Sequence, residues 1–283
     1  MTVQTEILID DLRFPEGCRW HDGSLWFSDM HSGVVYRTDA EGRNPVAVMS
    51  IDDRLSGMDW LPDGSLVVSG MLTRRVFRRS PEGEVSVYAD LSSATPYPIN
   101  DLIRLPTGHL VVGGFGYDLY ADEAPLPGPL FSIDEQGDWS LVADDLVFPN
   151  GMVLLSTGEL VVAETFAGRL TAYDLDGTGA LTGRRLWATL PEGATPDGLC
   201  VDADDAVWVS SIVPQQFLRV TAGGAVTDTL ALGDRLAVDC VLGGADGRTM
   251  FLATADSWAP EVTERTRAGR IERVTVDAAG VTA

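Results

Sequence analysis

Short apolar runs recur along the whole chain in pairs, with a polar turn between the two members of each pair. The pairs are seen in the stretches "HDGSLWFSD", "PDGSLVVSG", "PTGHLVVGG", "STGELVVAE", "ADDAVWVSS" and "ADGRTMFLA". Apolar runs separated by Asp-Gly or similar turns are typical of β-hairpins. Successive turns are 41 to 50 residues apart, and they begin at Asp22, Asp63, Thr107, Thr157, Asp204 and Asp246. The pattern therefore predicts one hairpin in each of six consecutive units.

Each unit continues beyond its hairpin in a similar way. A third run follows in all six units, as in "GVVYRTD" and "GRLTAYD", and a fourth follows in all but the last. Repeats of about 40 to 50 residues with four strands each are typical of β-propeller blades, whereas a β-sandwich would leave many runs unused. The opening stretch "TEILIDDL" belongs to no unit, so we expect it to supply the outer strand of the sixth blade and close the ring. The sequence predicts a single all-β domain over residues 1–283, a six-bladed β-propeller with four antiparallel strands per blade.

Oxygen-bearing residues recur just before the first apolar run of each unit. We find them by counting back seven residues from the turn, or from the triplets Pro-Glu-Gly, Pro-Asn-Gly and Pro-Asp-Gly. In a propeller the first strand of each blade lines the central channel, so equivalent positions should converge around the axis at one end. The six positions hold Glu16, Ser56, Asn100, Asn150, Asp197 and Asp239.

Carboxylate and amide oxygens gathered on an axis are costly to bury without a partner, because like charges repel in a low-dielectric interior. A cation relieves this cost, and hard oxygen ligands without His or Cys suit Ca²⁺, with Mg²⁺ and Mn²⁺ as alternatives. The competing interpretation is that these side chains cap strand ends or bind channel water, and we favour it for Ser56 and Asp239. We predict one divalent metal ion with the core ligands Glu16, Asn150 and Asp197.

Around these residues the chain resembles the senescence marker protein/gluconolactonase/luciferin-regenerating enzyme family. The similar stretches are "RFPEGCRWHDGSLWFSD", "INDLIRLPTGHLVVGGFGYD", "VFPNGMVLLSTGELVVAETFAGRLTAYDLD" and "TPDGLCVDADDAVWVSS". The resemblance implies a six-bladed propeller with one divalent metal ion in its channel, usually assigned as calcium and sometimes as zinc. It also implies lactone hydrolysis, with sugar lactones among the substrates, although some relatives split phosphotriesters.

The resemblance carries specific roles onto this sequence. The metal ligands of the family correspond to Glu16, Asn150 and Asp197, and a further Asn near substrate and metal corresponds to Asn100. Sugar-lactonase members often have an Arg two residues before that Asn, where it contacts substrate hydroxyls, but this chain has Pro98. The departure weighs against a sugar lactone more than it weighs against lactone hydrolysis.

The loops after the second run of each unit should overhang the metal, because antiparallel strands alternate in direction. Ligand sites usually combine an apolar wall with a few polar groups. These loops indicate a substrate with an apolar or aromatic portion, although an aromatic residue here could instead pack within its own blade. The expected wall residues are Met30, His31, Met71, Phe115, Tyr117, Phe166, Ile212 and Trp258.

Composition and net charge limit the kinds of binding partner that the sequence favours. A net charge of −22 lacks the basic footprint of nucleic-acid binding and argues against docking on an anionic membrane. The N-terminus has no secretory pattern, and no apolar run is long enough to span a membrane. The cysteines, Cys18, Cys200 and Cys240, lack metal-ligand spacing and are expected to be small buried residues. We expect a cytoplasmic protein that acts on a small molecule.

Other catalytic routes have little support in the sequence. His21 and His109 lie in hairpin turns on the far face, and no Gly-x-Ser-x-Gly nucleophile elbow is present. We predict a metal-dependent, gluconolactonase-like lactonase in which the cation polarises the carbonyl, Asp197 orients or activates water, and Asn100 holds substrate or oxyanion. Two alternatives stay open: a phosphotriesterase-type hydrolase at the same metal, and a non-catalytic calcium-stabilised propeller that binds a small molecule.

Overall fold

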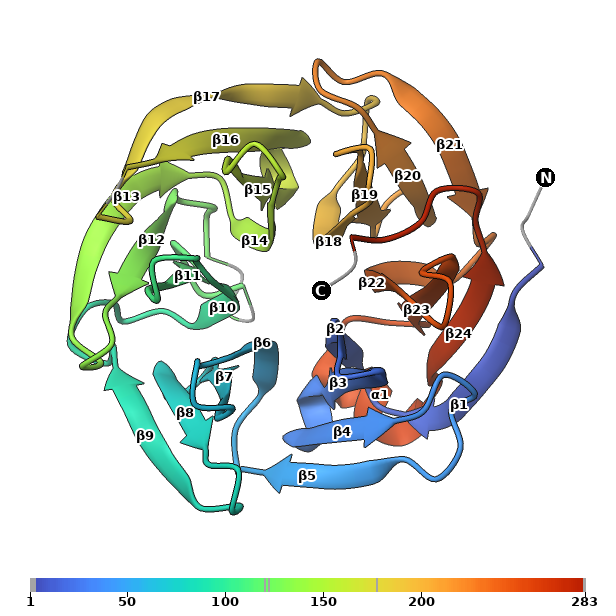
Figure 1. Ribbon diagram of the computed structural model, residues 1–283, viewed down its shortest axis with the longest axis horizontal. Helices are drawn as coiled ribbons and strands as arrows, with labels where there is room; N and C mark the ends of the chain where they lie inside the picture. The colour runs from blue at the N-terminus through green and yellow to red at the C-terminus, as the bar shows by residue number, and fades with distance from the viewer. Residues whose placement is uncertain (1–3, 120, 122, 177, 282–283) are drawn as a thin grey trace.

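The fold is a ring of six sheets. The computed structural model describes residues 4–119, 121, 123–176 and 178–281. These residues form six four-stranded antiparallel sheets around a central axis (Figure 1). The predicted six-bladed β-propeller is therefore confirmed.

The first three blades run from the axis outward in chain order. The first blade contains β2 (Pro15–His21), β3 (Ser24–Asp29), β4 (Val34–Thr38) and β5 (Val46–Ser50). The second contains β6 (Leu55–Trp60), β7 (Leu66–Gly70), β8 (Arg75–Arg79) and β9 (Val85–Asp90). The third contains β10 (Ile99–Arg104), β11 (Leu110–Gly114), β12 (Gly128–Ile133) and β13 (Trp139–Leu146).

The fourth and fifth blades repeat this order, and the sixth takes its outer strand from the other end of the chain. The fourth contains β14 (Pro149–Leu154), β15 (Leu160–Glu164), β16 (Arg169–Leu175) and β17 (Leu181–Thr189). The fifth contains β18 (Pro196–Val201), β19 (Val207–Ser211), β20 (Gln216–Val220) and β21 (Val226–Ala231). The sixth contains β22 (Leu236–Gly243), β23 (Thr249–Ala255), β24 (Gly269–Thr275) and β1 (Glu6–Leu12).

The ring closes as the sequence predicts. β1 pairs antiparallel with β24, with Ile9 opposite Ile271, so the first strand of the chain completes the last blade. This pairing covers the edge that β24 would otherwise expose and ties the two ends of the domain together.

Burial explains the sequence pattern of the strands. The second strands, such as β15, are buried along their whole length because their sheets pack against the neighbouring blades on both faces. A strand buried on both faces reads as a continuous apolar run rather than an alternating one. The outer strands, such as β17, are mostly exposed and correspondingly polar.

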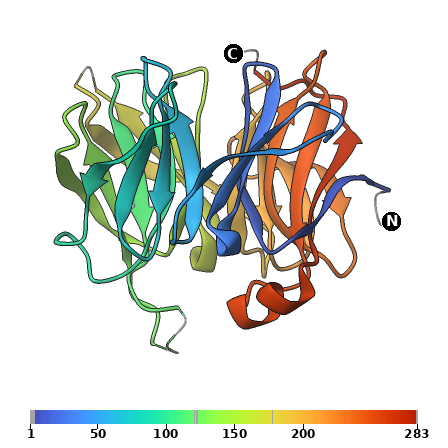
Figure 2. The ribbon, with the colours of Figure 1, turned by 90° about the horizontal axis from the view of Figure 1, so that it is seen from below.

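One end of the ring carries the segments that connect second to third strands. They include the short helices η1 (Met30–Ser32), η2 (Thr165–Ala167) and α1 (Pro260–Thr266), and Figure 2 shows them at the end opposite the C-terminus. The apolar pattern did not predict α1, because seven residues are too few to show a helical period. Within the described residues, no helix has the length and apolarity needed to cross a membrane.

Candidate active site and metal centre

The inner strands begin with a β-bulge that holds the predicted site residues. In the fourth blade Pro149 pairs with Glu164 and Met152 with Val162, so Asn150 and Gly151 occupy the irregular step. Bulges bend the strand and re-aim a side chain, and they are common beside active sites. Here the bulge turns the second residue of the inner strand toward the axis.

The glycine of each Pro-x-Gly frame is needed because neighbouring inner strands approach closely. A Cβ at Gly151 would lie 2.5 Å from the backbone oxygen of Asp197, and one at Gly17 would lie 2.6 Å from that of Ser56. Gly17 also has a φ of +59°, which favours glycine. The frame is therefore the local sequence requirement for bringing the ring residues together.

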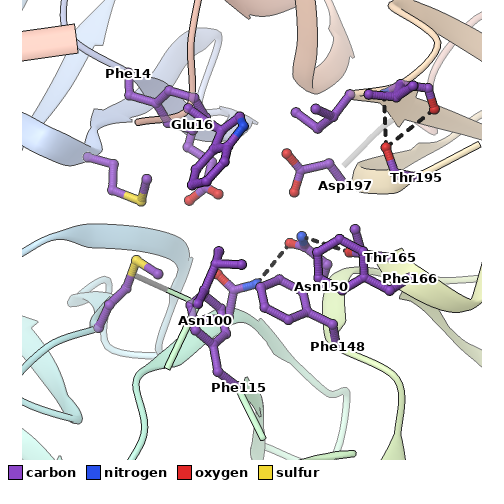
Figure 3. A pocket seen from close by; sticks show the side chains of 16 residues that line it. Phe14, Glu16, Asn100, Phe115, Phe148, Asn150, Thr165, Phe166, Thr195 and Asp197 are labelled. Carbon is purple, nitrogen blue, oxygen red and sulfur yellow. Dashed lines mark hydrogen bonds between the residues drawn. The ribbon is translucent and has the colours of Figure 1, made fainter. Parts of the chain in front are cut away.

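Four predicted residues meet in one cavity of about 250 Å³. Glu16, Asn100, Asn150 and Asp197 are buried and stand second in β2, β10, β14 and β18. Figure 3 shows their side chains reaching the same space from four different blades. Residues separated by up to 181 positions in the chain thus share one site, since all four occupy the same place in their blades.

Hydrogen bonds fix the two amides. The Nδ2 of Asn100 donates to the Oδ1 of Asn150 at 3.0 Å, and the Nδ2 of Asn150 donates to the Oγ1 of Thr165 at 3.2 Å. Thr165 in turn donates to the carbonyl oxygen of Pro196 at 2.7 Å. These consecutive hydrogen bonds link three neighbouring blades, and they orient the amide groups of both asparagines.

The two acidic residues of the site, Glu16 and Asp197, are both buried. Neither Glu16 nor Asp197 takes part in an ion pair within the described part of the chain, and Glu16 accepts a hydrogen bond from the hydroxyl of Ser56. Burial, with nearby Asp101 and Asp239, raises the pKa of Glu16 to about 8. Burial and the neighbouring charge of Glu16 raise the pKa of Asp197 well above its usual range. Two acidic groups are therefore held together where a positive charge would be favourable.

Of the remaining ring positions, Ser56 serves as a hydrogen-bond donor and Asp239 is not in the ring. In β22, Leu236 pairs with Ala255 as Pro149 pairs with Glu164, so the residue in the ring position is Ala237. The assignment of Asp239 to that position was wrong because β22 has eight residues where β14 has six. The carboxylate of Asp239 instead accepts the backbone N–H groups of Cys18 and Cys240 at 2.6 and 2.7 Å.

The donor set suits a hard cation. The described residues contain no group of three His, Cys, Asp or Glu side chains arranged to hold a metal ion, so any metal at this site would need the amides. Glu16 and Asp197 supply carboxylate oxygens, and Asn100 and Asn150 border the same cavity with amide oxygens. Oxygen-only sets of this kind fit Ca²⁺, and the unpaired buried carboxylates supply the charge that such an ion neutralises.

Most of the predicted wall residues line the cavity. Six of the eight do so: Met30, Met71, Phe115, Phe166, Ile212 and Trp258. The other two are absent from the described lining. His31 stacks on Phe14 with ring centroids 5.0 Å apart and shares a 2.7 Å hydrogen bond with Thr263, and burial lowers its pKa to about 3. Tyr117 packs against Phe148 with its ring centroid 6.0 Å away.

Sequence reasoning missed several lining residues. They are Phe14, Leu119, Phe148, Thr165, Thr195 and Val213. A signal existed for two of them, because Phe14 and Phe148 each stand two residues before a ring residue in the matching "FPEG" and "FPNG" stretches. The side chains at that place in the first and fourth blades both reach the cavity.

Comparisons with known proteins agree with this fold. The family model described as SMP-30/Gluconolactonase/LRE-like region matches residues 14–256. Pentonolactonase XacC of Haloferax volcanii is 28% identical over 292 residues, covering 99% of this chain and 96% of the relative.

Two solved structures share the fold. A luciferin-regenerating enzyme superposes with a TM-score of 0.84 at 17% identity, covering 99% of this chain and 98% of the other. The calcium-binding protein regucalcin from Agrobacterium tumefaciens superposes with a TM-score of 0.82 at 17% identity, covering 99% and 96%. Relatives named as lactonases support lactone hydrolysis as an activity within the matched family. The chain belongs to the SMP-30/gluconolactonase/LRE-like family.

Proposed function

We propose that the protein is a metal-dependent lactonase, which hydrolyses a lactone to a hydroxy acid, or a related ester to an acid and an alcohol. The observation that carries the proposal is the pair of buried carboxylates, Glu16 and Asp197, which share a cavity with Asn100 and Asn150 and have no ion-pair partner in the described chain. Buried acidic groups with raised pKa values, set in a cavity, are typical of functional sites. The lactonase name of the Haloferax volcanii relative supports the reaction type.

In this proposal Glu16, Asn150 and Asp197 hold one divalent cation, and Asn100 faces the substrate. Ca²⁺ is the preferred ion because all the donors are oxygens, and one structural relative is named a calcium-binding protein. Zn²⁺, Mg²⁺ and Mn²⁺ are the alternatives. When bound, the cation supplies Lewis-acid polarisation of the substrate carbonyl.

Asp197 is the general base of the proposed reaction. As the oxygen of water forms its bond to the carbonyl carbon, a water proton moves to the Asp197 carboxylate. When the tetrahedral species collapses, the bond between the carbonyl carbon and the ring oxygen breaks, and the proton passes from Asp197 to the departing alkoxide. Asn100 contacts the substrate, and its amide is held in place by its hydrogen bond to Asn150.

The proposal is tested by metal analysis together with hydrolysis assays. Purified protein should contain a stoichiometric divalent metal, and chelation should abolish hydrolysis of aliphatic and aromatic lactones until Ca²⁺ is restored. Asp197→Ala should abolish turnover while circular dichroism stays native. Asp246→Ala, in an exposed turn, is the matched control and should retain activity.

Two outcomes would overturn the proposal. Lactone hydrolysis by Asp197→Ala under strict chelation would show that neither the metal nor this carboxylate is needed. If the protein hydrolysed phosphotriesters but none of the aliphatic and aromatic lactones, the result would favour the phosphotriesterase alternative at the same residues.

A further inference from the structure

The cavity has an oxygen-bearing floor and hydrocarbon walls. Ten of its sixteen described lining residues are apolar, and they come from several blades. These ten are Phe14, Met30, Met71, Phe115, Leu119, Phe148, Phe166, Ile212, Val213 and Trp258. A bound molecule would meet the four ring residues at one end and mostly carbon elsewhere.

Aromatic rings form one continuous side of the cavity. The centroid of Phe148 lies 4.2 Å from that of Phe115 and 5.0 Å from that of Phe166, and the latter pair meets edge to face (Figure 3). Phe148 has a φ of +60°, a left-handed backbone conformation that is costly for a bulky residue. Strained residues of this kind cluster at ligand sites, where the surrounding structure maintains them.

The polar side chains on the walls are already engaged with protein atoms. Thr195 accepts the N–H of Val213 at 2.8 Å and donates to the oxygen of the same residue at 3.3 Å. Thr165 bonds Asn150 and the oxygen of Pro196. Each threonine hydroxyl has already given its single proton to a protein oxygen, so these walls offer no donor to the oxygen of a substrate hydroxyl, and burying that oxygen against them is unfavourable.

No basic side chain occurs among the described lining residues. Phe14 and Phe148, which line the cavity, each stand two residues before the ring residue of their blade. At the equivalent sequence position, the second blade has Arg54 and the sixth blade has Arg235. Arg235 is directed elsewhere, because it donates to Thr254 and to the oxygen of Ala268 and lies 3.3 Å from Glu272. Pro98 at the equivalent place in the third blade has no donor. The described lining residues therefore supply no charged donor of the kind that suits a polyhydroxylated ring.

Apolar side chains also stand at the mouth. Phe166 and Trp258 are each 48% exposed and Val213 is 50% exposed, although all three line the cavity. Exposed apolar groups at the entrance of a site favour a ligand that covers them. A substituent extending outward from a lactone ring would remove this surface from water.

From these observations we infer that the substrate is a lactone or ester bearing a hydrocarbon substituent, and that the site discriminates against sugar lactones. The inference rests on the proposed lactonase function and adds the substrate class. The hydrocarbon substituent lies along Phe115, Phe148 and Phe166, with its outer part against Trp258. The Haloferax volcanii relative, by its name, acts on a pentonolactone, so this chain differs from it in specificity.

The test compares two kinds of δ-lactone on the metal-loaded protein. For a series with alkyl substituents of increasing length, kcat/KM should rise about four-fold per buried methylene. Glucono-δ-lactone should be at least about 100-fold poorer than the pentyl-substituted δ-lactone, because its hydroxyls remain unpaired. Equal or faster hydrolysis of glucono-δ-lactone would overturn the inference and leave the proposed function intact.

A binding measurement separates the two proposals. If no lactone is hydrolysed with any metal, the proposed function fails, and calorimetry with δ-lactams, which resist hydrolysis, still tests the pocket. The pentyl-substituted δ-lactam should bind at least about 100-fold more tightly than the lactam of gluconic acid. Equal affinity for the two lactams would overturn the inference.

Substitutions at the entrance of the cavity test which residues cause the preference for a long alkyl substituent. Both Phe166 and Trp258 are half exposed, so the double variant Phe166→Ala/Trp258→Ala should fold. It should raise KM for the pentyl δ-lactone about 10-fold, with little change in kcat or in KM for the methyl analogue. Leu186→Ala, on the outer strand β17 and 60% exposed in the native protein, is the matched control and should match the wild type. An unaltered chain-length dependence in the double variant would contradict the inference.

Discussion

Glu16 and Glu164 are both buried glutamates, but they differ in the hydrogen bonds and ion pairs that their carboxylates receive. Glu164 ends β15, and its side chain accepts two hydrogen bonds from Arg169 at 2.9 and 2.8 Å and one from the backbone N–H of Val147 at 2.8 Å. Glu16 accepts the hydroxyl of Ser56 and forms no ion pair within the described chain. One carboxylate is fully compensated by the protein, whereas the other is not.

The pKa values follow from this difference. Burial raises the pKa of Glu16 to about 8, and the nearby acidic groups add to the effect. Burial also acts to raise the pKa of Glu164, but hydrogen bonds from Arg169, Thr171 and Val147 outweigh it and leave the pKa below its usual range. Burial alone therefore does not identify a functional carboxylate. A buried carboxylate whose partner must come from outside the chain is the better candidate.

The largest expected effect is the loss of activity when Glu16, but not Glu164, is replaced by Gln. Glu16→Gln removes a carboxylate from the proposed metal site, so kcat/KM for a lactone should fall about 10³-fold. Because Gln keeps the size of Glu and cannot ionise, it avoids the cost of burying an acid whose pKa burial raises, so the metal-free stability at pH 7 should not fall. Steady-state kinetics and urea unfolding of the same preparation measure both quantities. Near-native activity in Glu16→Gln would contradict the assignment of Glu16, rather than Glu164, to the functional site.

Metal addition should stabilise the protein through Glu16 but not through Glu164. At a Ca²⁺ concentration of 100 Kd, the free energy of unfolding of the wild type should rise by about 2.7 kcal/mol. Thermal unfolding with and without chelator should show this gain in the wild type and in Glu164→Gln, and not in Glu16→Gln. An equal gain in all three proteins would place the cation elsewhere.

Removing the compensated carboxylate should cost stability. Glu164→Gln breaks charge-assisted hydrogen bonds to a fully buried acceptor, so we expect the free energy of unfolding to fall by about 2 kcal/mol. The loss is held to this size because the Arg169 side chain is 37% exposed and can regain water. Urea unfolding of the metal-free protein measures it, and a loss as small as that of Glu16→Gln would contradict the comparison.

The smallest effect is a pH dependence. The pKa of Glu164 is lowered on folding, so its contribution is complete above the unfolded value of about 4.3 and is lost as pH falls through the folded value. Between pH 5 and pH 3, the wild type should therefore lose more stability than Glu164→Gln. Parallel unfolding curves for the two proteins across this window would show that the hydrogen bonds to Glu164 contribute little.

The repeat made the fold predictable from the chain alone. Hairpin turns at intervals of 41 to 50 residues implied six blades, and the lone strand before the first unit implied closure, as β1 and β24 show. These features are local or periodic, so they can be read without knowing contacts. The inner-strand starts could also be located, since Asn150 and Asp197 stand in matching Pro-x-Gly frames.

Counting along the chain failed where an element changed length. The longer strand β22 moved the ring position from Asp239 to Ala237, and only the strand pairing shows this. The direction of side chains was equally hidden. His31 lies beside Met30 in the sequence, yet His31 turns back against Phe14 and Thr263, whereas Met30 lines the cavity.

By itself the sequence determined the number of blades, the closing strand and the kinds of atom that gather near the axis. It did so because apolar periods, turn residues and glycine requirements are set by short stretches of backbone. The tertiary structure alone decided which of those atoms share a cavity and which are already paired. Glu16 and Glu164 are the same residue type, and only contacts made by residues distant from them in the chain give them opposite pKa shifts. Partner availability depends on packing in three dimensions, and a linear pattern does not encode it position by position.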